Sequence, residues 1–237
     1  MRGNPAVKKA LESFGENELI HSAKLYREKL SGQITEAAYY KTLERMCKSG
    51  ELVKIAKGTY CLPKVTKYGI VLPSEKEIIS EFTKNRTGTV VGYSLYNELN
   101  LTTQVSKTVK VLSSALESFS KSIRNIVVHQ TQLDFTEEVK NMVHGLEVLQ
   151  NFYTIQDINY SSFIEYSKKL ALSFNNEAFD EVLWNKQYKK ATISFFREIL
   201  NYYGVENNLD IYLSSLSEYK HPKMEELYET SRIYNWI

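Results

Sequence analysis

The sequence predicts an α+β protein built from three consecutive parts, and three patterns lead to this prediction. Residues 1–68 carry three helical apolar repeats followed by a β-hairpin pattern, residues 69–155 mix helix-like and strand-like runs, and residues 156–237 carry helical repeats alone. The 237 residues are 43% apolar and 24% charged, with only 10 Gly and 4 Pro, which excludes a disordered or low-complexity chain. We therefore expect domains at 1–68, 69–155 and 156–237.

Three short helices are expected at the start of the chain. The first begins at Pro5, where the missing N–H costs nothing, with Asn4 as its N-cap and Gly15 as its stop. The second covers about residues 22–30 and the third about residues 35–48, each with apolar residues three and four apart.

Two strand-like runs follow the third helix, at residues 52–55 and 59–62. Gly58 in the loop between them supplies the positive φ that a tight hairpin turn requires. Pro63 ends the second strand because it has no N–H to donate. Residues 1–68 thus have the element order of three helices and a hairpin.

The rest of the chain shows two capping boxes. Ser74 is followed three residues later by Glu77, and Asp134 by Glu137, so a helix is expected to open at each of these sites. The second of these helices is expected to run to about residue 152. Strands are expected at 89–91, 107–112 and 125–130, and further helices at 93–99, 163–174, 177–184, 191–203 and 224–234.

Charge is distributed unevenly along the chain. Residues 1–68 hold 13 Lys/Arg and 7 Asp/Glu, a net charge of +6, whereas residues 69–237 hold 17 Lys/Arg and 21 Asp/Glu, a net charge of −4. A basic module joined to an acidic one favours a polyanionic partner for the first part.

Motifs for common chemistries are absent. The chain has no Walker phosphate loop, no Gly-x-Gly-x-x-Gly unit, no Gly-x-Ser-x-Gly elbow and no His-Glu-x-x-His pair, so we expect no enzyme, no cofactor and no metal. Cys47 and Cys61 fall at apolar positions and are expected to be buried thiols. No long apolar run and no signal-peptide pattern is present, so we expect a cytoplasmic protein without membrane contact.

The third helix is the candidate DNA-contacting element. Its expected inner stripe is Tyr39, Leu43, Met46 and Cys47, which leaves an outward face of small and charged residues: Ala37, Ala38, Lys41, Glu44, Arg45 and Lys48. Small residues allow close approach to a major groove, and the long cations then reach bases or phosphates.

Other residues of the first part would hold the phosphate backbone. Thr35 is placed to bind a phosphate at the helix N-terminus, and Lys54 and Lys57 lie on the hairpin, with Lys64 and Lys67 extending the same strip. The alternative is that the outward cations form an ordinary solvated face, with Glu44 interrupting the positive field.

Four sequence runs carry a family resemblance. They are YYKTLER at residues 39–45, KSGEL at 48–52, AKGTY at 56–60 and GYSLYNELNLTTQV at 92–105. Together these runs resemble the winged helix-turn-helix and the second domain of the AbiE-type antitoxins, which belong to type IV toxin–antitoxin and abortive-infection systems. The chain has Asn100 where this family usually has Gly, and Ser106 where it usually has Pro. Asn tolerates the left-handed conformation, so we expect Asn100 to end the helix before it.

The resemblance implies a function in phage defence. It implies that the N-terminal domain binds double-stranded DNA at inverted repeats in its own operator, and that the C-terminal region neutralises a nucleotidyltransferase toxin encoded next door. The chain lacks the Gly-Ser and paired aspartates that such transferases use, so it is not expected to be the toxin.

Three alternatives stay open at this stage. The chain is a protein-interaction module that keeps the helix-turn-helix only as a scaffold, a transcriptional regulator without antitoxin activity, or an enzyme with an unrecognised site. For the polar run at residues 102–104, a turn held by side-chain hydrogen bonds is favoured over a binding site.

Overall fold

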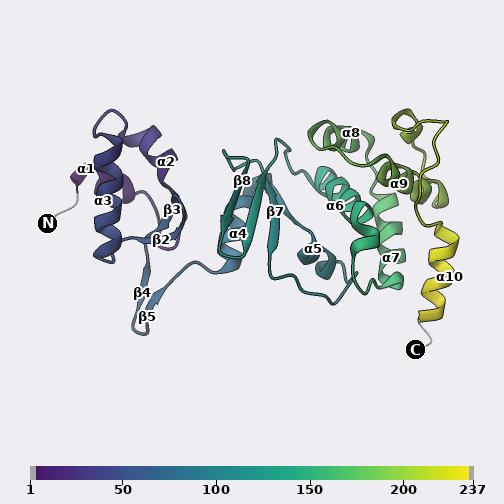
Figure 1. The fold of residues 1–237 in the computed structure, drawn as a ribbon, viewed down its shortest axis with the longest axis horizontal. Coiled ribbons are helices and arrows are strands. Elements are labelled where there is room, and N and C mark those ends of the chain that lie inside the picture. The colour runs from purple at the N-terminus through teal and green to yellow at the C-terminus, as the bar shows by residue number, and fades with distance from the viewer. Residues whose placement is uncertain (1–3, 235–237) are drawn as a thin grey trace. The chain divides into compact units, whose positions relative to one another are not determined.

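The computed structural model describes residues 4–234 and shows a mixed α+β protein (Figure 1). The chain divides into two compact units. The N-terminal unit contains the residues up to Glu81 together with Ser122–Arg124, and the C-terminal unit contains Phe82–Lys121 and the chain from Asn125 onward. The proposed boundaries at 68 and 155 remain predictions, although a single apolar core joins residues on both sides of position 155.

The N-terminal unit begins with helices and continues with short strands. The elements are α1 (Pro5–Leu11), β1 (Ile20–His21), α2 (Ser22–Leu25), the π-helical turn η1 (Tyr26–Leu30), α3 (Glu36–Lys48), β2 (Val53–Ala56), β3 (Thr59–Cys61), β4 (Lys64–Thr66) and β5 (Gly69–Val71). Strands β1, β3 and β2 form an antiparallel sheet with β3 in the centre, and β4 pairs with β5 in a separate hairpin.

The helices expected in this unit are present, with two differences from the prediction. The Asn4 cap is confirmed, because its side-chain oxygen accepts from the Ala6 N–H at 3.0 Å. Helix α1 ends at Leu11 rather than near Gly15, since the Phe14 N–H donates to the Leu11 carbonyl and closes a turn. The second expected helix changes from α to π geometry at Tyr26.

Helix α4 (Glu75–Thr83) and η2 (Lys84–Arg86) lead into the elements of the C-terminal unit. These are β6 (Gly88–Val91), α5 (Tyr93–Glu98), β7 (Val109–Ser113), β9 (Ile126–Gln130), α6 (Glu137–Asn151), η3 (Phe152–Thr154), α7 (Tyr160–Leu172), α8 (Asn176–Asn185), α9 (Lys190–Tyr202), η4 (Leu209–Tyr212) and α10 (Met224–Tyr234). Strand β8 (Ser120–Ile123) begins in this unit, and its last two residues are assigned to the N-terminal unit. The four-stranded sheet has the order β6-β7-β9-β8, with β6 antiparallel and β9 parallel to β7.

The core of the C-terminal unit lies between this sheet and the helices. Thr89 of β6 and His144 of α6 are joined by a hydrogen bond of 2.7 Å, so α6 covers the sheet face that carries Thr89 and its partner Leu112. Aromatic rings fill the space between the later helices. The centre of the Phe196 ring lies 5.6 Å from the ring centres of both Phe174 and Phe179.

Capping in this region follows the sequence in part. The Ser74–Glu77 box is confirmed by reciprocal bonds of 2.7 and 3.2 Å. The cap expected at Asp134 is wrong: Thr136 caps α6 by accepting from the Val139 N–H, while the Asp134 carboxylate is paired with Arg86. Asn100 has φ 57°, which confirms the expected left-handed helix end.

The sequence did not predict four of the strands. Strands β1, β4, β5 and β8 were all absent from the expected elements. Across residues 4–234, every helix is too short or too polar to span a bilayer.

Candidate nucleic-acid interface

Helix α3 is held in one orientation by its buried side. Tyr39 and Leu43 are fully buried and Met46 nearly so. The Tyr39 hydroxyl donates to the Ser22 carbonyl at 3.0 Å, and its ring stacks on Tyr26 with centroids 5.3 Å apart. Burial raises the pKa of Tyr39 above its usual value, so the hydroxyl stays a donor. These contacts fix the rotation of α3 about its axis, so its opposite side faces outward.

The outward side of α3 carries the predicted residues. Ala37, Ala38, Lys41, Arg45 and Lys48 are all exposed. Within residues 4–234, the side chains of Lys41 and Arg45 make no hydrogen bond and no ion pair. Both cations are therefore available to a ligand.

Lys48 differs from these two cations because it is engaged within the helix. Its ammonium group lies 2.7 Å from the carboxylate of Glu44, one turn earlier. The hydrogen bond from Lys48 holds the pKa of the Glu44 carboxyl below its usual value. Lys48 must exchange this partner before it can bind a phosphate.

Thr35 serves first as a helix cap. The Ala38 N–H approaches the Thr35 hydroxyl oxygen at 3.4 Å, a long capping contact. Thr35 is exposed, so its backbone and hydroxyl lie at an accessible helix N-terminus.

The two hairpin lysines are exposed beside α3. Lys54 lies in β2, close enough to Cys47 of α3 for its charge to oppose the rise that burial causes in the pKa of that thiol. Lys57 lies in the β2–β3 loop beside Gly58, which has φ 68° as the hairpin prediction requires. Like those of Lys41 and Arg45, the side chains of Lys54 and Lys57 have no hydrogen-bonded or ion-paired partner in the part of the chain that the structure describes.

Ser22 connects this loop to α3. Its N–H donates to the Gly58 carbonyl at 3.0 Å, and its own carbonyl accepts from Tyr39. The structure thus brings Lys57 toward the N-terminal half of α3 and Lys54 toward the C-terminal half.

The predicted buried thiols are confirmed for one cysteine only. Cys61 is buried in β3, whereas Cys47 is half-buried. Burial raises the pKa of both thiols, so each is a poor nucleophile at neutral pH.

The unpredicted β4–β5 hairpin adds Lys64 and Lys67 to the exposed cations of the N-terminal unit. The Lys67 ammonium lies 4.9 Å from the centre of the Tyr68 ring, which is 88% exposed.

The polar run at residues 102–104 is held by side-chain hydrogen bonds, which is the alternative that the sequence favoured. The Thr102 hydroxyl donates to the Gln156 carbonyl at 2.6 Å, and the Gln104 amide donates to Asp157 at 2.6 Å. The Asn97 amide donates to the carbonyls of residues 102 and 104 at 2.7 and 3.0 Å. These bonds tie the turn to the chain before α7 and account for its polarity.

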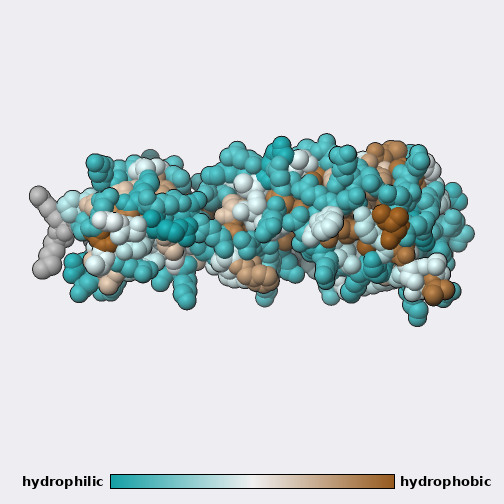
Figure 2. Space-filling view, turned by 90° about the horizontal axis from the view of Figure 1, so that it is seen from above, coloured by the Kyte–Doolittle hydropathy of each residue, from teal (hydrophilic) through white to brown (hydrophobic). Residues whose placement is uncertain are grey.

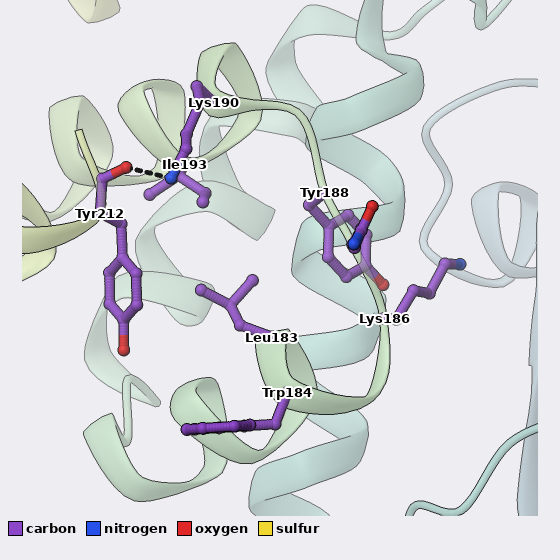
Figure 3. A pocket seen from close by; sticks show the side chains of 8 residues that line it. Leu183, Trp184, Lys186, Tyr188, Lys190, Ile193 and Tyr212 are labelled. Atoms are coloured by element: carbon purple, nitrogen blue, oxygen red, sulfur yellow. Dashed lines mark hydrogen bonds between the residues drawn. The ribbon is translucent and has the colours of Figure 1, made fainter. Parts of the chain in front are cut away.

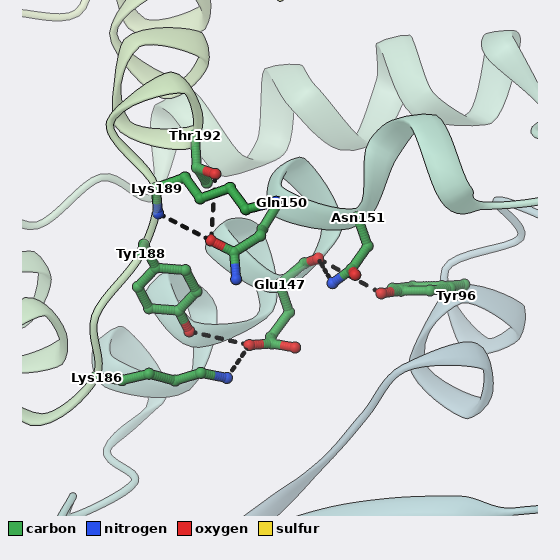
Figure 4. A network of polar contacts seen from close by, with 8 residues as sticks. All are labelled: Tyr96, Glu147, Gln150, Asn151, Lys186, Tyr188, Lys189 and Thr192. Carbon is green, nitrogen blue, oxygen red and sulfur yellow. Dashed lines mark hydrogen bonds and ion pairs between the residues drawn. The ribbon is translucent and has the colours of Figure 1, made fainter.

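The C-terminal unit contains a buried carboxylate that the sequence did not reveal (Figure 4). One oxygen of Glu147 on α6 is paired with the Lys186 ammonium and accepts from the Tyr188 hydroxyl at 3.2 Å. Its backbone carbonyl accepts from Asn151 at 2.8 Å and from Tyr96. The network anchors the chain between α8 and α9 to α6. Among residues 4–234, no group of three His, Cys, Asp or Glu side chains is arranged to hold a metal ion.

Comparison with known proteins identifies a family without an assigned function. Residues 19–150 match DUF6088, a family of unknown function. No curated protein matches the chain. A crystal structure of the RV2827C protein from Mycobacterium tuberculosis is similar over 84% of this chain and 76% of that one, with 10% identity and a TM-score of 0.42. That likeness is too weak to carry a conclusion about fold or function.

Proposed function

We propose that this chain, which belongs to the DUF6088 family of unknown function, is a DNA-binding autorepressor and the antitoxin of a type IV toxin–antitoxin system. In this proposal the N-terminal unit is a winged helix-turn-helix and α3 enters the major groove. The observation that carries it is the outward face of α3, whose other side is buried in the core. On this face Lys41 and Arg45 are exposed, and no residue from 4 to 234 pairs with their side chains.

The arrangement matches what duplex recognition needs. Ala37 and Ala38 leave room for the helix to approach base edges, and Arg45 has the planar donor group that pairs with guanine. Lys54 and Lys57 then lie beside the helix, where a wing contacts the neighbouring backbone.

The antitoxin part of the proposal is supported by sequence likeness. Residues 39–60 and 92–105 resemble two segments of the AbiE-type antitoxins. The cognate partner would be a nucleotidyltransferase encoded beside this gene. A transcriptional regulator without antitoxin activity would bind DNA in the same way. Co-expression with the nucleotidyltransferase distinguishes it from an antitoxin.

The DNA-binding half is tested with the full chain and a labelled duplex from upstream of its own gene. We expect the double variant Lys41→Ala/Arg45→Ala to bind at least about tenfold more weakly, because one base contact is worth about 1–3 kcal/mol. The slope of binding against salt should also fall by about one logarithmic unit per lost phosphate contact.

A matched control removes the same charge elsewhere. Lys168 and Lys169 are exposed on α7 of the C-terminal unit, so Lys168→Ala/Lys169→Ala should leave binding unchanged. Equal affinity of wild type and Lys41→Ala/Arg45→Ala would overturn the assignment of α3.

The antitoxin half is tested by co-expression. The chain should restore growth to cells that express the neighbouring nucleotidyltransferase. Repression without rescue would leave a transcriptional regulator, and rescue by the Lys41→Ala/Arg45→Ala variant would show that neutralisation does not need DNA binding.

A further inference from the structure

A pocket of about 380 Å³ lies beside the four-stranded sheet of the C-terminal unit, on the sheet face that α6 covers. Leu112 of β7 and His129 of β9 are register partners on this face, and both line the pocket. Val91, Leu112 and Leu133 are buried and give the pocket an apolar wall. Its volume is that of a small-molecule site, which is roughly 300–1,000 Å³.

Glu147 of α6 lines the same pocket and has one carboxylate oxygen without a partner. Its side chain is only 10% exposed. The Oε1 atom takes both of the side-chain contacts drawn in Figure 4, from the Lys186 ammonium and from the Tyr188 hydroxyl at 3.2 Å. The Oε2 atom accepts no hydrogen bond from residues 4–234, and it is not sealed from solvent. A desolvated carboxylate oxygen without a donor is costly, so a ligand that donates an N–H to Oε2 is favoured here.

The charged side chains that line the pocket carry a net positive charge. Lys186 is balanced by Glu147, but Lys110 of β7 is a second lining cation. Lys110 is exposed, and within residues 4–234 its side chain has no hydrogen bond or ion pair. The pocket therefore disfavours a cationic ligand and favours one with an anionic group, for which lysine is a common partner when that group is a phosphate.

One ligand class combines these three features. A nucleobase has flat faces that pack on apolar side chains and an edge that carries N–H donors, and a nucleotide adds a phosphate. We propose that this pocket binds a nucleoside monophosphate, with a base N–H donated to Glu147 Oε2 and the phosphate held by Lys110. The pocket lies entirely within the C-terminal unit, so this inference does not rest on the proposed DNA binding by α3.

The neighbouring pocket, where α8 turns into α9, lacks such a group. It is larger, at about 480 Å³, and is lined by Trp184 and Tyr212 among others (Figure 3). Lys190 at its wall already donates to the Tyr212 carbonyl. Apolar patches also occur among hydrophilic residues on the surface of this unit (Figure 2). In the described part of the chain, it is the open oxygen of Glu147 that specifies the chemistry of a ligand.

The first test titrates the full chain with AMP, GMP, CMP and UMP by isothermal titration calorimetry. At least one of them should bind with one site per chain. The matching nucleoside and inorganic phosphate should each bind at least about tenfold more weakly, because each lacks one of the two polar contacts. Ligand-observed NMR covers these weaker ligands. Binding of phosphate alone, as tightly as the nucleotide, would overturn the proposal, and so would a chain that binds none of the four.

The second test separates the two polar contacts with variants. Lys110→Ala should weaken the monophosphate about tenfold and leave the nucleoside unchanged, whereas Glu147→Gln should weaken both. Lys107→Ala is the matched control for Lys110→Ala, because Lys107 is exposed and lies outside the pocket lining. Glu165→Gln on α7 is the control for Glu147→Gln. Circular dichroism checks that each variant is folded.

A third measurement leaves the protein unchanged, so it does not depend on how well Glu147→Gln folds. The bound monophosphate is compared with its counterpart in which N-methyl groups replace the N–H groups of the base. The methylated ligand should bind wild type at least about tenfold more weakly, because it has no donor for Oε2. Equal binding of the two ligands, or equal effects of Lys110→Ala and Lys107→Ala, would contradict the proposed site.

Discussion

Lys41 in the N-terminal unit and Lys186 in the C-terminal unit have opposite surroundings. Lys41 lies on the outward face of α3 and has no side-chain partner among residues 4–234. Lys186 is instead paired with Glu147, whose side chain is only 10% exposed. An exposed cation keeps its hydration and can exchange water for a ligand at little cost. In the Lys186–Glu147 pair the carboxylate has given up most of its hydration, so removing Lys186 leaves that carboxylate uncompensated. The same residue type is thus open to solvent in one unit and supports folding in the other.

The largest effect should come from breaking the buried pair. We expect Lys186→Met to lower the free energy of unfolding by about 3 kcal/mol, the lower end for buried pairs, since Lys186 itself is 33% exposed. Denaturant titration of the full chain measures this loss. Lys189→Met should change stability by less than about 0.5 kcal/mol, because that side chain is exposed and pairs with none of the residues that the structure describes.

A second variant sharpens this prediction. Lys186→Met/Glu147→Gln should be more stable than Lys186→Met alone, because a neutral amide replaces the unpaired carboxylate. A Lys186→Met variant as stable as wild type would remove the contrast between the two units.

The response of the C-terminal unit to acid should be of similar size. Burial lowers the pKa of His144 to about 4, and the nearby charge of Lys140 acts in the same direction. A hydrogen bond to the Val90 backbone raises the pKa, but by less. Between about pH 6.5 and pH 4 the unfolded chain therefore binds a proton that the folded chain does not, and stability falls as the pH falls. The full contribution, about 3 kcal/mol, is present above pH 6.5 and is lost by about pH 4.

The variant His144→Gln isolates this contribution. It removes the titrating ring but retains a hydrogen-bonding partner for Thr89, so its stability should depend less on pH over this range. Parallel pH curves for wild type and His144→Gln would show that His144 titrates alike in both states.

Helix caps should have intermediate effects that differ between the units. Thr136→Ala should cost about 1 kcal/mol, because this cap accepts at 3.1 Å and is partly buried. Thr35→Ala should cost less, because its contact of 3.4 Å is long and exposed. Thermal unfolding of both variants provides the comparison, and a larger loss for Thr35→Ala would contradict it.

The smallest effect concerns the negative charge within the proposed DNA-binding face. Glu44→Gln releases Lys48 and removes a repulsive charge, so affinity for the duplex should rise by about two- to fivefold at low salt. Fluorescence anisotropy measures the change, with Glu165→Gln on α7 as the control for net charge. Weaker binding by Glu44→Gln would mean that Glu44 itself contacts the DNA.

Sequence patterns predicted elements best where the signal was local. The caps at Asn4 and Ser74 and the left-handed Asn100 followed from residues a few positions apart. The cap at Asp134 failed because Arg86, 48 positions earlier, takes its carboxylate. A local motif does not report such a distant partner.

The candidate sites show the same limit. The outward position of Lys41 and Arg45 followed from the helical period, and the structure leaves both side chains exposed. Glu147 was not noticed because its partners Lys186 and Tyr188 lie 39 and 41 positions away. A lone glutamate within an apolar helix does not reveal whether it is buried or solvated.

The sequence by itself determined which face of α3 is apolar, where most helices begin and how charge divides between the two ends of the chain. These properties depend on residues within one or two turns of each other. The tertiary structure alone decided which charges are free, which are buried in pairs, and that Trp184 stands beside a pocket. Those outcomes depend on packing between segments far apart in the chain, where desolvation and partner geometry set the energy.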